Sequence, residues 1–285
     1  MFKDTFAALI LTHNRPNQQK TIKTLRRLNY TGKIYLVCDD EDPSLDEYIK
    51  MYSDQVLVFS KKEIAEKMDV GNNFEGLKGV VYARNAAHDL AKKAGLTHFI
   101  ELDDDYAGFY WKNNSKKVYT TPILMRNLDN VFERMVDYLE STPFKTICMA
   151  QGGDFIGGFY GQHGGRITLL RKAMNSFVCA VDRPFQFMGA INEDVNAYVS
   201  LGNRGDLFAT LTQISLNQMT TQAQSGGLTE IYLDAGTYVK SFYTVMYSPS
   251  CTKIAQIGTL HPRLHHRVKW ENAVPKIIGE EYRRV

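Results

Sequence analysis

Short, continuously apolar runs separated by helical segments make up the first third of the chain. The runs lie at residues 6–11, 33–38, 55–59 and 98–102. Between them, apolar side chains recur at helical spacing, at residues 22–28, 44–52 and 80–93. An apolar run without polar alternation is typical of a strand that is buried on both faces of a sheet. Strands that alternate with helices therefore predict an α/β fold with a mostly parallel central sheet flanked by helices.

The rest of the chain is less regular and predicts a mixed arrangement. We expect strands at residues 145–150, 167–171 and 177–181, a helix that begins at Glu193, and a longer helix at residues 229–246. A glycine-rich stretch at residues 151–165 follows the first of these strands. Glycine at this density fits a flexible linker or a loop that approaches a ligand closely. The aromatic and amide side chains between the glycines favour an ordered loop.

Polar side chains gather where three of the early strands end. Thr12, Asn14 and Arg15 follow the first strand, Asp39 ends the second, and a run of three aspartates follows the fourth. The carboxyl ends of parallel strands meet at one edge of a sheet, and ligands bind there. The sequence therefore predicts one binding edge.

The three aspartates, Asp103, Asp104 and Asp105, are the most concentrated charge in the chain. Side chains alternate across an extended strand, so Asp103 and Asp105 are expected to face a common ligand and Asp104 to point away and tolerate replacement better. Oxygen ligands favour Mg²⁺ or Mn²⁺, which bind through one or two carboxylates and a substrate phosphate. The alternative is a solvated acidic turn.

The first strand leads into Thr-His-Asn-Arg-Pro, which matches neither GxGxxG nor GxxxxGK[ST]. This disfavours dinucleotide-dependent dehydrogenases and P-loop enzymes. A site that holds a nucleotide diphosphate without such a loop can neutralise the phosphates with a divalent ion instead.

Composition sets wide limits. The 285 residues carry a net charge of +3 and are 44% hydrophobic, as in an ordinary globular protein. The four cysteines are scattered, which indicates reduced thiols and a cytoplasmic location. No apolar stretch is long enough for a membrane segment. We expect one domain over residues 1–285, with a nucleotide-binding half at 1–106 and an acceptor half at 107–285 that ends in a basic tail.

The order of these motifs resembles the nucleotide-sugar-binding half of a GT-A glycosyltransferase. The motifs are Thr12-His13-Asn14-Arg15-Pro16, Asp39-Asp40, Ala83-Arg84-Asn85-Ala86-Ala87, Leu102-Asp103-Asp104-Asp105 and Asn192-Glu193-Asp194-Val195. The resemblance implies a UDP-sugar donor and a Mn²⁺ or Mg²⁺ ion held by Asp105, with Asp103 on the ion or the ribose. It also implies that Thr12, Asn14 and Arg15 meet the nucleoside, Asp39 the base, and Arg84 the uridine or diphosphate.

The same resemblance implies roles on the acceptor side. If the reaction inverts the sugar, Asp194 is expected to be the general base, with Glu193 as the alternate. Otherwise both carboxylates simply cap a helix N-terminus. Lys240 is a candidate phosphate ligand, or part of a solvated helix face. Of His261, His265 and His266, we expect His265 to complete the metal shell; the other interpretation is a packing or surface pair.

The second half also resembles the phage DNA-modifying glycosyltransferases related to the base-J and TET-associated transferases, through Asn192-Glu193-Asp194-Val195-Asn196, Gly236-Thr237-Tyr238-Val239-Lys240-Ser241-Phe242 and Arg263-Leu264-His265-His266. This implies transfer of a sugar to a hydroxylated or hydroxymethylated pyrimidine, such as hydroxymethylcytosine, in bacteriophage DNA within the host cytoplasm. The base would be flipped out of the stack. Aromatic residues are candidates to stack on it, and basic residues to meet phosphates: Tyr110, Trp111, Phe155, Phe159 and Tyr160, and Lys112, Lys116, Lys117 and the basic tail.

Two alternatives remain open at the sequence level. One is a GT-A glycosyltransferase that acts on a glycan or another acceptor; the other is a catalytically silent module that binds a nucleotide sugar or DNA. The sequence does not define the donor sugar, the acceptor base, the stereochemistry, the choice between Mn²⁺ and Mg²⁺, or the oligomeric state.

Overall fold

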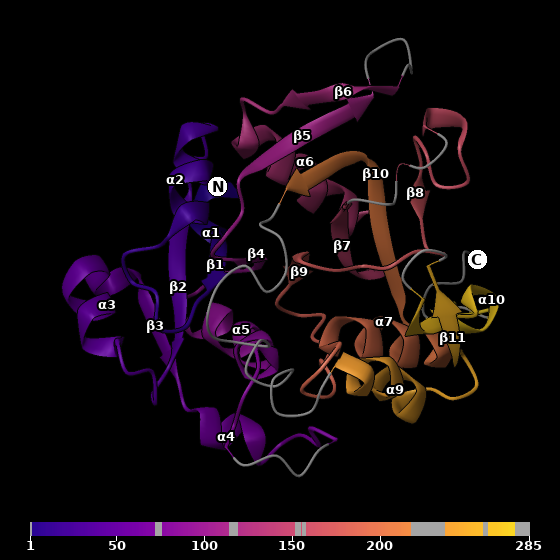
Figure 1. The fold of residues 1–285 in the computed structure, drawn as a ribbon. Coiled ribbons are helices and arrows are strands. Elements are labelled where there is room, and N and C mark those ends of the chain that lie inside the picture. The colour runs from indigo at the N-terminus through magenta and orange to yellow at the C-terminus, as the bar shows by residue number, and fades with distance from the viewer. Residues whose placement is uncertain are drawn as a thin grey trace.

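The computed structural model describes residues 2–71, 76–113, 119–151, 155, 158–217, 237–258 and 262–276. Within these residues the chain forms a large central sheet with helices on both faces, and a separate two-stranded sheet near the C-terminus (Figure 1). The expected α/β class is confirmed, and the central sheet is mixed rather than mostly parallel.

The first half follows the predicted alternation closely. Its elements are α1 (Phe2–Thr5), β1 (Phe6–Leu11), α2 (Lys20–Arg27), β2 (Lys33–Asp39), α3 (Leu45–Tyr52), η1 (Ser53–Gln55), β3 (Val56–Phe59), α4 (Lys61–Ala65), α5 (Val81–Lys93) and β4 (His98–Asp103). The pattern succeeds here because these strands are short, apolar and bounded by polar turns.

The second half contains elements that the apolar pattern did not indicate. Its elements are β5 (Gly108–Asn113), β6 (Tyr119–Leu124), α6 (Leu128–Glu140), β7 (Phe144–Ala150), η2 (Gly158–Tyr160), β8 (Ile167–Thr168), β9 (Ser176–Ala180), α7 (Glu193–Arg204), β10 (Leu207–Asn217), α9 (Thr237–Tyr247), β11 (Thr252–Ile257), β12 (Arg263–Val268) and α10 (Trp270–Ala273). The helix predicted at 229–246 is described only from Thr237 onward, and the expected basic tail begins with a strand.

The strand order in the central sheet is β3-β2-β1-β4-β9-β7-β10-β5-β6, with β8 added on β10. Strands β1 to β4 are parallel, whereas β9 runs antiparallel to both β4 and β7. The sheet therefore continues without a break from the first half into the second.

Alternate residues of each buried strand pack into two hydrophobic cores, one on each face. In β1, Phe6, Ala8 and Ile10 face the core that is covered by α2, α3 and α6. Ala7, Leu9 and Leu11 face the core that is covered by α4, α5 and α7. Burial on both faces explains why β1 has no polar position.

The elements after residue 237 pack beside α7. Helix α9 contacts α7, β11 and β12, and α10 contacts α7. Residues around Asn192 and the inner side of α9 form a small core of their own, with Ala190, Ile191 and Tyr243 buried. All four cysteines are buried free thiols, as expected. None of the helices in the described ranges is long and apolar enough to cross a membrane.

Candidate active site

The ends of β1, β2 and β4 lie side by side at one edge of the sheet. Strand β1 pairs with both neighbours, so Leu11 is opposite Val37 on one side and Asp103 on the other. The polar residues that follow these strands therefore converge, as the sequence predicts. Helices α3 and α4 add further polar side chains to the same edge.

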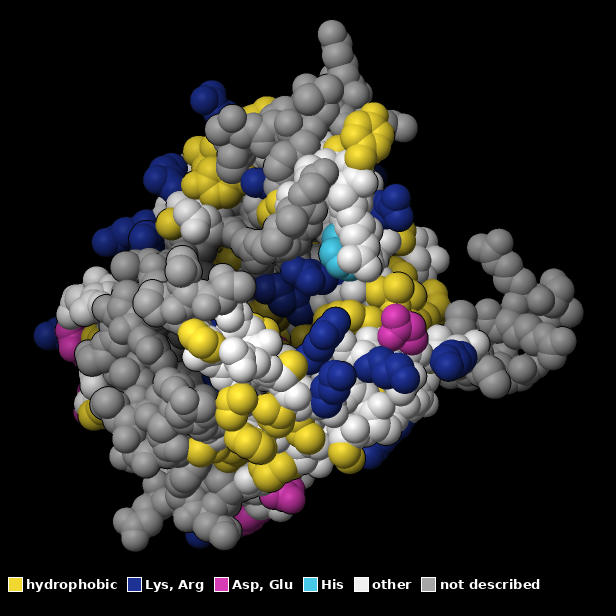
Figure 2. Space-filling model, turned by 45° about the vertical axis from the view of Figure 1, so that its right-hand side comes forward, with side chains coloured by type: hydrophobic (Ala, Val, Ile, Leu, Met, Phe, Trp, Pro, Cys, Tyr) yellow, Lys and Arg dark blue, Asp and Glu magenta, His cyan; other side chains and the backbone are white. Residues whose placement is uncertain are grey.

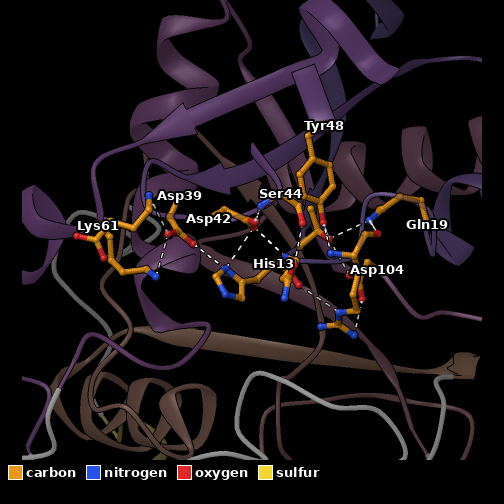
Figure 3. A network of polar contacts seen from close by, with 12 residues as sticks. His13, Gln19, Asp39, Asp42, Ser44, Tyr48, Lys61 and Asp104 are labelled. Carbon is orange, nitrogen blue, oxygen red and sulfur yellow. Dashed lines mark hydrogen bonds and ion pairs between the residues drawn. The ribbon is translucent and has the colours of Figure 1, made fainter. Parts of the chain in front are cut away.

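Thr12 is the centre of a buried hydrogen-bond network (Figure 3). Its hydroxyl donates to Asp104 Oδ2 at 2.8 Å, accepts from Gln19 Nε2 at 2.8 Å, and lies 2.7 Å from the Tyr48 hydroxyl. Tyr48 also accepts from the Arg15 backbone N–H at 2.8 Å. These bonds fix the loop after β1 against α3 and the end of β4.

Asp104 is the carboxylate that anchors this loop. Its side chain is 4% exposed, and its Oδ1 lies 3.3 Å from Arg15 Nη1. The strand ends at Asp103 and a turn follows, so the alternation assumed for an extended run no longer applies to Asp104 and Asp105. Asp104 faces inward, away from the Arg84 that Asp103 contacts, and it holds two residues of the loop; its tolerance to replacement stays a prediction, which these contacts do not favour.

A second network joins β1, β2 and α4 through His13, as Figure 3 shows. His13 Nδ1 lies 3.0 Å from Asp39 Oδ2 and 3.2 Å from Asp42 Oδ2. Lys61 Nζ lies 2.9 Å from the other oxygen of Asp39. The hydrogen bonds to Asp39 and Asp42 raise the pKa of His13 to about 9. Burial alone would raise the pKa of Asp39, but His13 and Lys61 lower it.

The sequence analysis quoted His13 only within a motif and gave it no role, and it did not single out Asp42 or Lys61. The only signal was their closeness to residues already singled out. Ligand atoms of His13, Asp39 and Asp42 lie within 4.8 Å of one another, near enough to hold one metal ion. A proton on His13 satisfies the same two carboxylates, and Lys61 already compensates the charge of Asp39. Asn14 supports this loop: its backbone N–H donates to Asp42 at 2.9 Å, and its side chain accepts from Ser44.

Asp105 differs from its two neighbours in having an unpartnered buried oxygen. Oδ1 of Asp105 has no hydrogen-bond partner within the described residues. Burial, followed by the charges of Asp103 and Asp104, raises the pKa of Asp105 to about 6. A buried carboxylate among like charges is costly unless a proton or a cation joins it.

Arg84, on α5, lies in a buried cluster of carboxylates from two other elements. Its Nη1 donates to Glu101 Oε1 at 2.7 Å, its Nη2 to Asp103 Oδ1 at 3.2 Å, and its Nε to Glu193 Oε1 at 3.0 Å. The Arg84 side chain is 3% exposed, and the rings of Phe177 and Phe187 lie 5.3 and 5.6 Å from its guanidinium carbon.

The guanidinium of Arg84 therefore uses all three of its nitrogens on carboxylates. This geometry ties the aspartate-bearing end of β4 to the first turn of α7. It departs from the expectation that Arg84 meets the uridine or diphosphate directly. Glu101, which is 1% exposed, was also missed by sequence analysis, because it sits inside an otherwise apolar strand.

Asp103 links the Arg84 cluster to the acidic turn. Its Oδ1 accepts from Arg84, and its Oδ2 accepts from the Tyr106 hydroxyl at 3.1 Å. The Tyr106 hydroxyl also contacts the backbone carbonyl of Asn175, so its single proton is shared between the two acceptors. The Asp103 side chain remains 27% exposed, so it still faces the binding edge.

The acceptor motif opens α7, as predicted, and both of its carboxylates are buried. Glu193 is bound to Arg84, whereas Asp194 Oδ1 accepts from the backbone N–H of Val195 at 2.7 Å. Burial raises the pKa of both groups. Because Glu193 neutralises Arg84, Asp194 is the better placed of the two to exchange a proton.

Asn192, just before these carboxylates, holds them against α9 and β12. It has a left-handed backbone with φ of 56°. Its side-chain amide donates to the Lys240 carbonyl at 2.7 Å and lies 3.4 Å from His266 Nδ1. His266, rather than His265, is thus the histidine beside the motif. The charge of Lys240 also reaches Asp194.

His265 lies in basic surroundings. Burial, and then the charges of Arg263, Lys240 and Lys172, lower the pKa of His265. Nearby cations oppose the binding of a further cation there. The role of His265 as a metal ligand remains a prediction, and His261 lies outside the described residues.

The residues that we expected to meet DNA differ in how exposed they are. Lys112 is 9% exposed and its ammonium lies 4.3 Å from the centre of the Phe155 ring, so it packs on an aromatic side chain, and its contact with a phosphate stays a prediction. Trp111 and Tyr160 are 40% and 89% exposed. Lys116 and Lys117 lie outside the described residues. In the described part of the glycine-rich stretch, a Cβ on Gly164 would meet the Gly158 carbonyl, so the backbone packs closely there.

Comparison with known proteins assigns this arrangement to a class. A family profile described as TET-Associated Glycosyltransferase matches residues 6–227, which include the binding edge, Arg84 and the carboxylates of α7. The chain is therefore a glycosyltransferase enzyme. It belongs to the TET-associated glycosyltransferase family.

Solved structures with a similar course of the chain also exist. Glucosyl-3-phosphoglycerate synthase from Mycobacterium tuberculosis, in complex with Mn²⁺, uridine diphosphate and phosphoglyceric acid, is 12% identical, with a TM-score of 0.47 over 93% of this chain and 87% of that one. S. aureus TarS 1-349 in complex with UDP is 11% identical, with a TM-score of 0.43 over 74% and 59%. No curated protein matches the sequence. The family assignment rests on the profile match alone.

Proposed function

We propose that this glycosyltransferase transfers a sugar, with inversion, from a UDP-sugar to a hydroxylated or hydroxymethylated pyrimidine in DNA, and that it depends on Mn²⁺ or Mg²⁺. The observation that carries the proposal is the Arg84 cluster. It joins the acidic end of β4, where a nucleotide diphosphate and its cation would lie, to the buried carboxylates of α7, where an acceptor would lie.

The donor side fits a divalent cation. Asp105 offers a buried carboxylate oxygen that has no partner among the residues the structure describes, and Asp103 faces the same edge. One arginine compensates three contacting carboxylates, and Asp194 and Asp105 add further negative charge, so the region is short of positive charge. Asp105 and Asp103 would hold the ion, which would stabilise the negative charge that develops on the departing diphosphate.

Other side chains of the site would bind the nucleoside and a phosphate and accept the proton of the acceptor. The network of His13, Asp39, Asp42 and Lys61 presents donors and acceptors to a nucleobase at the end of β2. Thr12 and Asp104 hold the loop that carries Asn14 and Arg15, so these side chains approach the nucleoside in a fixed geometry. Lys240, whose charge reaches Asp194, is proposed to meet a phosphate. Asp194 accepts the proton from the attacking hydroxyl, and Glu193 holds Arg84.

The name of the family favours a DNA base as the acceptor. A hydroxylated or hydroxymethylated pyrimidine offers the hydroxyl group that a glycosyltransferase needs as its acceptor. A base inside a duplex is out of reach of a recessed donor, so the acceptor base would leave the stack. Exposed aromatic side chains such as Trp111 and Tyr160 are candidates to contact the unstacked bases.

The direct test incubates the protein and Mn²⁺ with a panel of UDP-sugars and duplex DNA that contains hydroxymethylcytosine, hydroxymethyluracil or only ordinary bases. The DNA is then digested to nucleosides and weighed. We expect a mass gain of one sugar on a hydroxymethylated nucleoside and none on ordinary DNA. An Asp194→Asn variant serves as the matched control, because it preserves side-chain size while removing the base.

Each outcome decides a different part of the proposal. Transfer to a glycan panel with no transfer to any DNA overturns the DNA acceptor. UDP binding without transfer to either acceptor overturns the catalytic role and leaves a binding module. Equal transfer in excess EDTA overturns the metal dependence.

A further inference from the structure

The two-stranded sheet of β11 and β12 has one packed face and one exposed face. The strands pair antiparallel, with Lys253 opposite Arg267 and Ile257 opposite Arg263. Paired residues in an antiparallel ladder point to the same side, and the side alternates along each strand. Thr252, Val268 and His266 therefore share one face, and Lys253, Arg267 and Arg263 share the other.

The first of these faces packs on the acceptor side of the active site. Thr252 is buried, and its hydroxyl bonds with the Ser248 and Thr244 carbonyls of the α9 end. The Ser241 hydroxyl donates to the Leu264 carbonyl at 2.9 Å, and His266 lies 3.4 Å from the Asn192 amide. These contacts fix the two-stranded sheet of β11 and β12, the β11–β12 ribbon, next to the first turn of α7.

The opposite face is basic: its Lys and Arg side chains are exposed, whereas Ala255, Ile257 and His265 between them are half-buried. Lys253, Arg263 and Arg267 are all exposed, as is Lys269 just beyond β12. Neither strand contains an aspartate or a glutamate. Figure 2 shows Lys and Arg side chains gathered across the middle of the face that it draws, with little acidic surface beside them. A surface of this kind attracts a polyanion.

We propose that the outer face of the β11–β12 ribbon, with Lys253, Arg263 and Arg267, docks the phosphate backbone of duplex DNA and delivers the acceptor base to α7. This inference deepens the proposed function and rests on it for the identity of the acceptor. The six-residue strands of the ribbon span roughly 20 Å, a length of about six base pairs of duplex. A two-stranded ribbon of this width also fits the major groove.

Duplex DNA is favoured over other anionic partners because of where the ribbon is fixed. The packed face touches Asn192, the residue that precedes Glu193 and Asp194. The ribbon therefore lies beside the turn that carries the predicted general base, and a duplex on the outer face would lie across the ribbon from that turn.

The test compares two triple variants that each remove three positive charges. The ribbon variant is Lys253→Gln, Arg263→Gln and Arg267→Gln. The control variant is Lys23→Gln, Lys50→Gln and Lys92→Gln, exposed residues on α2, α3 and α5 of the first half. Fluorescence anisotropy with a labelled duplex of ordinary sequence is measured at several salt concentrations, in the absence of donor. UDP binding and thermal unfolding show whether each variant is folded.

We expect the ribbon variant to lose about tenfold or more in duplex affinity at low salt. The slope of log affinity against log salt concentration should become less negative by between about one and three. The control variant should match the wild type in slope. UDP binding should be unchanged in both. Affinity and slope equal to those of the control overturn the inference, as does a wild type that binds no duplex or prefers single strands.

The two proposals fail separately in this design. Anisotropy does not depend on sugar transfer, so a ribbon-dependent duplex affinity without transfer to modified DNA overturns the acceptor assignment but leaves the docking surface. Transfer to modified duplex that is equally fast in the ribbon variant overturns the docking surface but leaves the acceptor assignment.

Discussion

The three consecutive aspartates at the end of β4 show how far neighbouring residues of one type can differ. Asp103 accepts from Arg84 and Tyr106, Asp104 fixes the loop after β1, and Asp105 has a buried oxygen without a partner among the described residues. The sequence gives their charge and their position at a strand end. It does not say where the strand stops, and that single residue decides which way each carboxylate faces.

We therefore expect Asp105→Asn to weaken UDP binding without a loss of stability, and Asp104→Asn to lower stability. Asp105→Asn removes like-charge repulsion, so thermal stability in EDTA should be equal or higher, whereas UDP affinity in Mn²⁺ should fall about tenfold or more. Asp104→Asn breaks the charged contact with Arg15 and weakens the bond from Thr12, so it should lower the free energy of unfolding by about 1–3 kcal/mol.

Isothermal titration with UDP, with and without Mn²⁺, and thermal unfolding in EDTA measure both effects. Asp46→Asn, at an exposed position of α3, is the neutral control. If Asp105→Asn leaves Mn²⁺-dependent UDP binding intact, the carboxylate does not hold the ion. If Asp104→Asn is as stable as the control, its contacts with the loop contribute little.

His88, on α5, is a buried histidine outside the active site. Neither ring nitrogen has a hydrogen-bond partner within the described residues, and the ring packs edge-on against Phe99 and Phe185. Burial lowers the pKa of His88 to about 4. In the unfolded chain His88 takes up a proton near pH 6.5, whereas in the folded chain it stays neutral until about pH 4. The free energy of unfolding therefore decreases as the pH falls from about 6.5 towards 4.

His88→Leu should therefore flatten the pH dependence of stability. The difference in unfolding free energy between variant and wild type should grow in favour of the variant by up to about 3 kcal/mol between pH 7 and pH 4. Urea unfolding of both proteins across this range measures it. The comparison cancels the carboxylates, which titrate in both proteins. A constant difference across the range would show that the pKa of His88 is the same in the folded and the unfolded chain.

At the scale of elements, Arg84 connects α5, β4 and α7. The sequence analysis selected Arg84 from its motif but assigned it to the substrate, because a sequence shows a charge without its partners. Glu101 and Glu193 lie 17 and 109 residues away along the chain. The order of strands and helices in the first half was predictable, since it depends on local periodicity. The contacts between α5 and α7 were not, because they depend on how the two halves pack.

Arg84→Lys separates a positioning role from direct binding of the donor. A single ammonium keeps the charge but cannot reach three carboxylates as the planar guanidinium does. If Arg84 positions β4 and α7, kcat should fall at least about tenfold, KM for the UDP-sugar should change less than about threefold, and the pH profile should shift as Glu101 and Glu193 lose a partner. Stability should fall by about 1–3 kcal/mol.

Steady-state kinetics across pH, with UDP affinity measured separately, test this split. A large rise in both KM and the dissociation constant of UDP, with kcat little changed, would instead restore the assignment of Arg84 to the diphosphate. Lys92→Arg, an exposed change on the same helix, controls for general effects on α5.

At the scale of the whole molecule, the central sheet crosses the boundary between the two halves. Strand β4, the last of residues 1–106, pairs along its second edge with β9 of the later half. Phe132 of α6 packs against Phe6 and Tyr30, so the later half also covers one core of the earlier one. Sequence periodicity predicted a strand at residues 177–181 but gave no sign that this strand, β9, pairs with β4 from almost eighty residues downstream.

We therefore expect the halves to unfold together rather than as separate domains. Far-UV circular dichroism follows both halves, whereas both tryptophans, Trp111 and Trp270, lie in residues 107–285. The two signals should give coincident urea transitions. A fragment of residues 1–106 would expose the edge of β4 and the apolar side chains that α6 covers, so it should unfold or aggregate on size-exclusion chromatography. A monomeric fragment with a native helical spectrum, or two separated transitions in the full chain, would contradict this and show that the donor half folds alone.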